Sequence, residues 1–189
     1  MIKDLHILKE KFLQGKILPT KWLGDSPDRF DTYVNWASKV NHVTELGVYT
    51  GLATTAFLLG NPKVLRSYDI TSKYFKIRPQ LEEIAKQVNI DFKFQLANSC
   101  SVEIEPTEML FIDTNHKEEI TTRELQLHHS KVSKYILLHD TTAWPGVMCA
   151  IKKFLPVLYS NQVKLIKQDE NLATFWPGRK PEDGLLNLN

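Results

Sequence analysis

The sequence predicts an α/β protein with a doubly wound, mostly parallel sheet of seven strands. From position 42 onward, short apolar runs of strand length alternate with helical segments, which is typical of a parallel sheet that helices cover on both faces. The gap between Lys167 and Leu172 is too short for a crossover helix. The last two strands are therefore predicted to form an antiparallel hairpin at the end of the domain.

The predicted strands are short apolar runs bounded by polar or glycine-containing segments, and they cover residues 42–48, 64–70, 92–97, 109–113, 134–140, 163–167 and 172–176. Helices are predicted after Gly51, Pro79, Lys117 and Gly146. Before the strands, the apolar spacing of Ile2, Leu5, Leu8 and Phe12 indicates one amphipathic helix. Ser26-Pro27-Asp28 predicts the start of a second helix, which continues through Trp36.

The 189 residues and the 42% hydrophobic composition suit one domain with a single core. We divide that domain into an N-terminal helical cap (1–41), a core (42–178) and a tail (179–189). The net charge is +2, and the basic and acidic residues are interspersed, so the sequence shows no basic patch of the kind that binds nucleic acid. No apolar run is long enough for a membrane helix, so we expect a cytoplasmic protein that acts on neither nucleic acid nor membrane.

Isolated histidines, cysteines and aromatic residues are interpreted as structural. Cys100 and Cys149 form no C-x-x-C pair and are expected to be buried free thiols. Trp22, Tyr33 and Trp36 are expected to pack in the core, since aromatic residues at helical spacing usually do. His128 and His129 lie in a polar helical segment and are expected to face solvent.

A glycine turn connects the first predicted strand to a helix. Glu45, Gly47, Tyr49, Thr50 and Gly51 lie at the carboxyl end of that strand, where open α/β sheets bind ligands. Glycine allows a tight turn and close approach of a ligand, and the following helix N-terminus offers N–H groups to a carboxylate such as that of a methionine moiety. Glu45 is expected to meet a positively charged group of the ligand.

A dinucleotide site is the natural alternative for this turn, since it also uses a glycine turn and an acidic residue after the second strand. Tyr49, however, stands where the dinucleotide fingerprint needs glycine against a pyrophosphate. Asp69 ends the second strand, where a carboxylate can accept hydrogen bonds from both ribose hydroxyls; as a structural residue it would cap a helix. The pattern favours S-adenosylmethionine, which has no pyrophosphate.

Residues 42–176 resemble the Rossmann-like, seven-stranded fold of class I S-adenosylmethionine-dependent methyltransferases. The resemblance implies that Asn98 and Ser99, which follow the third strand, contact the adenine of the methyl donor. Both residue types are also common in ordinary turns. Fold resemblance alone does not establish this function.

Two later segments, Asp113-Thr114-Asn115-His116 and His139-Asp140-Thr141, each place polar residues after an apolar strand. They resemble the methyltransferases related to macrocin O-methyltransferase and cephalosporin hydroxylase. That resemblance implies that Asp113 and Asp140 bind a divalent metal, that His139 joins them and that His116 is the catalytic base. Asp113 is assigned a catalytic role beside His116 and a contact with the donor.

The metal's identity stays open at this point, because magnesium prefers oxygen ligands and a histidine ligand favours manganese, iron or zinc. His139 could equally lie outside the ligand set, and a metal-free enzyme is an alternative.

We predict O-methylation of a hydroxyl on a small molecule or sugar, in a protein that could form a homo-oligomer. The alternatives are a non-haem iron oxygenase that uses His116, His139 and a carboxylate, and a non-catalytic nucleoside-binding module.

Overall fold

The computed structural model describes residues 2–17, 29–160, 164–169 and 172–176, and the burial of side chains as far as Phe154. The chain forms two compact units, Met1–Ala97 and Asn98–Asn189. Both contain alternating strands and helices, which confirms the predicted α/β class. That the two units act as one domain stays a prediction.

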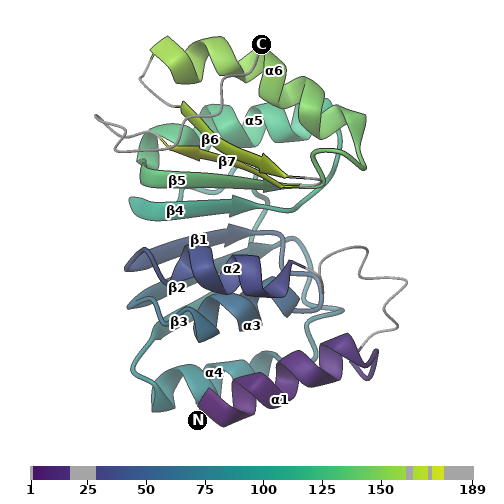
Figure 1. Cartoon of the computed structure of the whole chain (residues 1–189), viewed down its shortest axis with the longest axis vertical. Helices are drawn as coiled ribbons and strands as arrows, with labels where there is room; N and C mark the ends of the chain where they lie inside the picture. Colours follow the sequence, from purple (N-terminus) through teal and green to yellow (C-terminus); the bar gives the residue numbers. More distant parts are fainter. Residues whose placement is uncertain (1, 18–28, 161–163, 170–171, 177–189) are drawn as a thin grey trace. The chain divides into compact units, whose positions relative to one another are not determined.

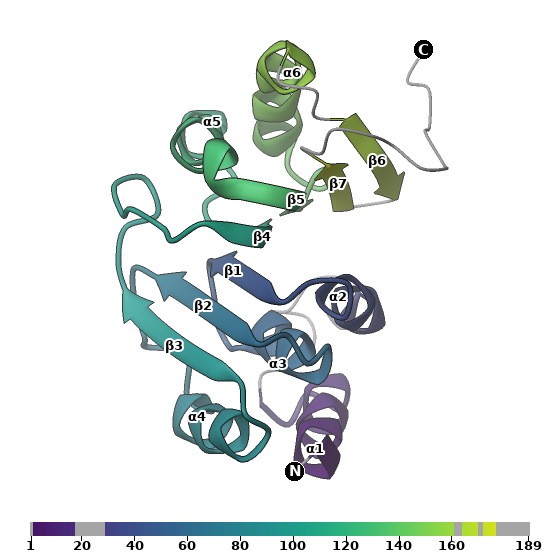
Figure 2. The ribbon, with the colours of Figure 1, turned by 90° about the vertical axis from the view of Figure 1, so that its left-hand side faces the viewer.

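The first unit contains a parallel sheet of three strands in the order β3-β2-β1 (Figure 1). Its elements are α1 (Ile2–Leu13), α2 (Phe30–Ala37), β1 (His42–Leu46), α3 (Leu52–Leu59), β2 (Val64–Asp69), α4 (Arg78–Gln87) and β3 (Asp91–Leu96). Since both crossovers run in the same direction along the sheet and such crossovers are right-handed, α3 and α4 cover the same face. Figure 2 shows α1 and α2 packed beside α3.

The core of the first unit is formed by the helical faces that the spacing predicts. Leu5, Leu8 and Phe12 of α1 are fully buried, and the rings of Tyr33 and Phe57 join α2 to α3 with their centroids 5.9 Å apart. Trp36 is also buried, as predicted. The predicted packing of Trp22 and the helix start at 26–28 lie outside the described residues.

Strand β3 is more exposed than a strand with helices on both faces. Phe92 and Phe94 are half-buried, whereas Asp91 before them and Lys93 between them are exposed. The buried Arg66 of β2 holds this strand by pairing with Asp91 at 2.5 Å, and its guanidinium lowers the pKa of that carboxyl. Such charged residues suit an edge strand, because they discourage pairing with another chain.

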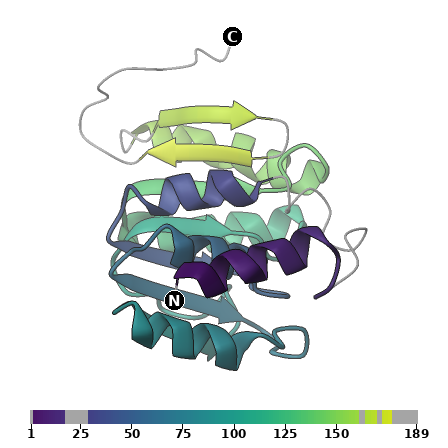
Figure 3. The ribbon, with the colours of Figure 1, turned by 60° about the horizontal axis from the view of Figure 1, so that its bottom comes forward.

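In the second unit, β4 and β5 are parallel, and β7 runs antiparallel to both β5 and β6 (Figure 3). The elements are β4 (Thr107–Ile112), α5 (Glu118–His128), a 3₁₀ turn (His129–Lys131), β5 (Val132–His139), α6 (Pro145–Ser160), β6 (Lys164–Asp169) and β7 (Leu172–Trp176). Helices α5 and α6 pack against each other. Strand β4 ends in the buried apolar run Met109–Ile112, and β5 ends in the buried apolar run Ile136–Leu138 followed by the buried His139, so Asp113 and Asp140 lie at the edge of the sheet.

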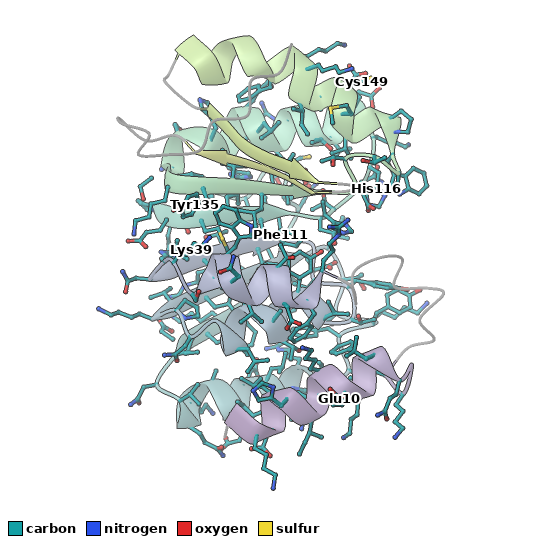
Figure 4. The ribbon with its side chains drawn as sticks, viewed as in Figure 1. Glu10, Lys39, Phe111, His116, Tyr135 and Cys149 are labelled. Atoms are coloured by element: carbon teal, nitrogen blue, oxygen red, sulfur yellow. The ribbon has the colours of Figure 1, made fainter. Side chains whose placement is uncertain are left out.

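Two predictions about single residues are wrong. His128 is buried rather than solvent-facing, because its Nε2 lies 2.7 Å from the carbonyl oxygen of Ser99. Cys149 is exposed on α6 rather than buried (Figure 4), and Cys100 is half-buried. Among the described residues, no helix has the length and apolar character needed to span a membrane.

Candidate active site

The glycine loop, residues 47–51, connects β1 to α3 through a strained backbone. Gly47, Tyr49 and Gly51 have positive φ angles of 89°, 50° and 87°, and such angles are inexpensive only for glycine. A Cβ atom on Gly51 would lie 2.4 Å from the ring of Phe75. Glycine is therefore required at position 51 for both its backbone angle and its packing.

Asp69 at the end of β2 holds the glycine loop in place. Its Oδ2 accepts hydrogen bonds from the backbone N–H groups of Val48 and Tyr49 at 2.8 and 3.0 Å. Its Oδ1 accepts one from the N–H of Thr71 at 2.9 Å. Each carboxylate oxygen has further acceptor capacity, so a ribose contact is compatible with these bonds and stays a prediction.

Glu45 of β1 is fully buried. Its carboxylate accepts hydrogen bonds from Thr54 Oγ1 at 2.9 Å and from Ser67 Oγ at 2.5 Å. These bonds tie the end of β1 to α3 and β2, the elements on either side of the glycine loop. The predicted contact with a positively charged ligand group is not tested by them.

Two other predicted loop residues differ in their exposure. Thr50 is buried, whereas Tyr49 is 42% exposed and its ring lies 5.1 Å from that of Tyr74. No side chain caps the N-terminus of α3 at Gly51. The N–H groups of its first turn thus suit a negatively charged group of a ligand.

The second unit brings together Asp113, His116, His139 and Asp140, which we call the His–Asp cluster. Figure 4 shows His116 at the carboxyl ends of β4 and β5. His116 Nε2 lies 2.6 Å from Asp140 Oδ2 and 3.7 Å from Asp113 Oδ1. His139 Nδ1 lies 3.4 Å from Asp140 Oδ2 and 3.6 Å from Asp113 Oδ1. The four residues that the sequence singled out are therefore neighbours in space.

The charges of the cluster stabilise one another. The neighbouring carboxylates of Asp113 and Asp140 raise the pKa of His116 to about 9. Burial opposes ionisation of Asp113, but the nearby His139 and His116 imidazoles lower its pKa overall. The pKa of Asp140 is lowered too, since the nearby imidazoles of His116 and His139 outweigh the effect of burial. At neutral pH, His116 is consequently a cation between two carboxylates.

The raised pKa of His116 predicts that the metal-free protein loses stability as the pH rises. Because the folded-state pKa of about 9 exceeds the unfolded value of 6.5, the stabilisation is complete below pH 6.5 and is lost as the pH passes 9. We expect the free energy of unfolding to fall by about 3 kcal/mol across that range. Urea unfolding in the presence of a chelator measures it, and His116→Asn should flatten the pH dependence. An equal fall in that variant would contradict the assignment.

The cluster also fits a divalent cation. One ligand atom each from Asp113, His139 and Asp140 lies within 4.8 Å of the other two. Two carboxylate oxygens and one imidazole nitrogen, partly shielded from solvent, form a donor set that suits manganese, iron or zinc better than magnesium. These residues could therefore hold the metal that the resemblance implies.

Trp144 is a site residue that the sequence analysis missed. Its ring stacks on the imidazole of His116, with centroids 4.9 Å apart and planes 15° apart. Trp144 is 51% exposed, so it extends the His–Asp cluster towards solvent. The only signal in the sequence was a tryptophan shortly after a predicted strand end, which does not distinguish a site residue from a surface one.

Gly146 allows the start of α6 to lie directly against the loop that carries His116. A Cβ at this position would be 2.4 Å from the carbonyl oxygen of His116 and 2.9 Å from the N–H nitrogen of Glu118. Both atoms belong to the backbone, so Gly146→Ala must displace the loop. We expect turnover to fall about tenfold from this misplacement, measured as kcat beside the surface control Lys152→Ala. Unchanged kcat would show that the loop position is unimportant.

Asn98 and Ser99, predicted to contact adenine, form a well-bonded turn. Asn98 Oδ1 accepts the N–H of Cys100 at 2.9 Å, and Ser99 Oγ donates to Glu124 Oε1 at 2.5 Å. The turn interpretation is thus correct for Asn98, and the adenine contact stays a prediction. Glu124 was also missed, because a glutamate in a helix is usually exposed.

Solved structures resemble the chain, although no model of a known protein family and no curated protein matches its sequence. The O-methyltransferase from Bacillus cereus in complex with SAH is 12% identical, with 93% of this chain and 89% of that chain covered and a TM-score of 0.61. Cofactor-bound Rv0187 from MTB is 12% identical (79% of each chain, TM-score 0.58), and the O-methyltransferase NovP is 14% identical (81% of each chain, TM-score 0.57). The chain has the methyltransferase fold.

This methyltransferase fold hosts more than one kind of acceptor. The similar structures also include a tRNA methyltransferase in complex with S-adenosyl-L-homocysteine and an rRNA methylase. At these low identities the likeness establishes the fold, and function must be argued from the site residues. The narrower resemblance to macrocin O-methyltransferase and cephalosporin hydroxylase stays a prediction.

Proposed function

We propose that the protein is an S-adenosylmethionine-dependent methyltransferase that methylates a hydroxyl of a small molecule or sugar. The observation that carries the proposal is the His–Asp cluster, in which His116 lies against Asp113 and Asp140 at the carboxyl ends of two parallel strands. In a chain with the methyltransferase fold, these strand ends are where ligands bind. The proposal includes one seven-stranded sheet with the strands β6 and β7 as its closing hairpin.

The methyl donor is assigned to the glycine loop and the residues after the next strands. The N–H groups at the start of α3 would receive the donor's carboxylate, and Gly47 and Gly51 keep the loop close to the ligand. Glu45, which joins β1 to α3 and β2, is assigned as a further donor-binding residue. The remaining assigned contacts are Tyr49, Thr50, Asp69, Asn98, Ser99 and Asp113.

His116 is assigned as the base that removes the proton of the acceptor hydroxyl. An imidazole must be deprotonated to act in this way, whereas the two carboxylates keep His116 protonated up to a pKa of about 9. Turnover without a metal should therefore increase towards pH 9. Trp144 covers one face of the imidazole and would help to place the acceptor beside it.

Asp113, His139 and Asp140 are the residues that would hold a divalent metal. When bound, the metal would lower the pKa of an acceptor hydroxyl and orient it. The same carboxylates would then interact less strongly with His116, so its pKa should fall towards the neutral range. The non-haem iron oxygenase alternative uses the same ligands, but the structural relatives favour methyl transfer.

Methyl transfer is tested with donor that carries a tritiated methyl group. We would offer catechols, other hydroxylated aromatics and sugars in parallel with total RNA, each with and without manganese. The proposal expects label in a hydroxyl-containing small molecule and none in RNA. Label in RNA alone would contradict the acceptor class, and oxygen consumption with iron and no transferred label would favour the oxygenase.

A further inference from the structure

Glu124 is a fully buried acid on α5 that contacts two functional loops. Its Oε1 accepts hydrogen bonds from Ser99 Oγ at 2.5 Å and from Thr114 Oγ1 at 2.6 Å. Ser99 belongs to the turn assigned to the donor, and Thr114 directly follows Asp113 of the His–Asp cluster. One oxygen atom thus connects two loops that the proposed function assigns to different parts of the reaction.

Helix α5 holds the first of these loops at a second point. His128, one turn after Glu124 on the same face of the helix, places Nε2 2.7 Å from the carbonyl oxygen of Ser99. Both the side chain and the backbone of Ser99 are therefore fixed to α5. Because Thr114 bonds to the same oxygen as Ser99, the spacing between the two loops depends on Glu124.

The burial of the Glu124 carboxylate destabilises the folded protein. Its other oxygen, Oε2, is buried and has no hydrogen-bond partner among the described residues. A buried acid with an unsatisfied oxygen costs free energy, and burial raises the pKa of Glu124. An apolar side chain of similar size would avoid this cost. The acid is therefore better explained by what its Oε1 holds than by stability.

We propose that Glu124 is a positioning residue, which fixes the Ser99 turn and the Thr114 loop at the spacing that methyl transfer needs. The inference rests on the proposed function. Glu124 itself contacts neither donor nor acceptor in this account. Its effect on the reaction is transmitted through the two hydroxyls that it binds.

The test compares variants that remove the acceptor oxygen with one that keeps it. Glu124→Met removes it, and we expect the KM for the donor to rise and kcat to fall, each about tenfold. Glu124→Gln keeps one carbonyl oxygen that can accept both hydroxyls, and it should stay within about threefold of the original values. Ser99→Ala should raise KM alone, and Thr114→Val should lower kcat alone.

Stability measurements separate positioning from a structural role. The melting temperature of Glu124→Met should stay close to that of the original protein although its activity is lower, because loss of the unsatisfied Oε2 offsets the loss of two hydrogen bonds from half-buried hydroxyls. Thr121→Val, which removes a buried hydroxyl from the same helix, is the matched control and should change neither KM nor kcat.

Unchanged kinetics in Glu124→Met would overturn the inference, as would a loss in Glu124→Gln as large as that in Glu124→Met. Binding of S-adenosylhomocysteine is measured on all variants as a readout that needs no acceptor. If the original protein binds no S-adenosylhomocysteine, the proposed function fails and the inference fails with it. If it binds and turns over while the variants match it, only the role of Glu124 is wrong.

Discussion

His116→Asn should lower kcat about a thousandfold while leaving the affinity for S-adenosylhomocysteine within about threefold. The imidazoles of His116 and His139 both lie beside the two carboxylates, but the side chain of His116 is 29% exposed and that of His139 only 4%, so an acceptor can reach His116. Asparagine keeps polar atoms and moderate size but cannot take a proton from the acceptor. Initial rates at saturating donor, together with calorimetric binding, measure the two effects separately.

His129→Asn is the matched control for this experiment. His129 is half-buried, its Nδ1 lies 2.9 Å from the carbonyl oxygen of Leu125, and its ring packs edge-on against Phe154. It lies outside the assigned site, so its replacement should leave kcat unchanged. Normal turnover in His116→Asn would disprove the base assignment, and an equal loss in both variants would point to stability instead.

Asp69→Ala should weaken S-adenosylhomocysteine binding about a hundredfold, because two effects combine. The variant loses the predicted ribose contact, and it also releases the N–H groups of Val48 and Tyr49 that shape the glycine loop. Hydrogen bonds to a charged group contribute about 1.5–3 kcal/mol each, so the loss of one or two accounts for this magnitude. Calorimetric titration gives the affinity directly.

Asp69→Asn separates the two effects, since its amide oxygen can still hold part of the loop without the negative charge. We expect an intermediate loss of affinity in this variant. Asp31→Ala removes an exposed acid that pairs with Lys9 in the same unit and should bind normally. Full affinity in Asp69→Ala would show that this carboxylate neither holds the ligand nor organises its loop.

The elements of the fold were predictable because periodicity and glycine positions are local signals. The alternation of apolar runs located β1, β2, β4 and β5 to within one or two residues. Polar residues after those runs located the His–Asp cluster, since carboxyl ends of neighbouring parallel strands lie at one edge of a sheet. Asp113, His116, His139 and Asp140 are close together for that reason.

The site residues that could not be predicted from the sequence make their contacts with residues distant along the chain. Glu124 and Ser99 are 25 positions apart, and the burial of His128 follows from the same turn. No local pattern distinguishes these side chains from the exposed polar residues of an ordinary helix. The stacking of Trp144 on His116 likewise depends on how α6 begins, which Gly146 determines through close backbone packing.

Calorimetric titration with S-adenosylhomocysteine tests most directly whether the protein binds a methyl donor. The titration is made with and without manganese, and NADH serves as the control ligand. We predict saturable binding of S-adenosylhomocysteine, none of NADH, and a separate uptake of manganese that Asp113→Asn abolishes. Absence of S-adenosylhomocysteine binding, or binding of NADH alone, would contradict the account.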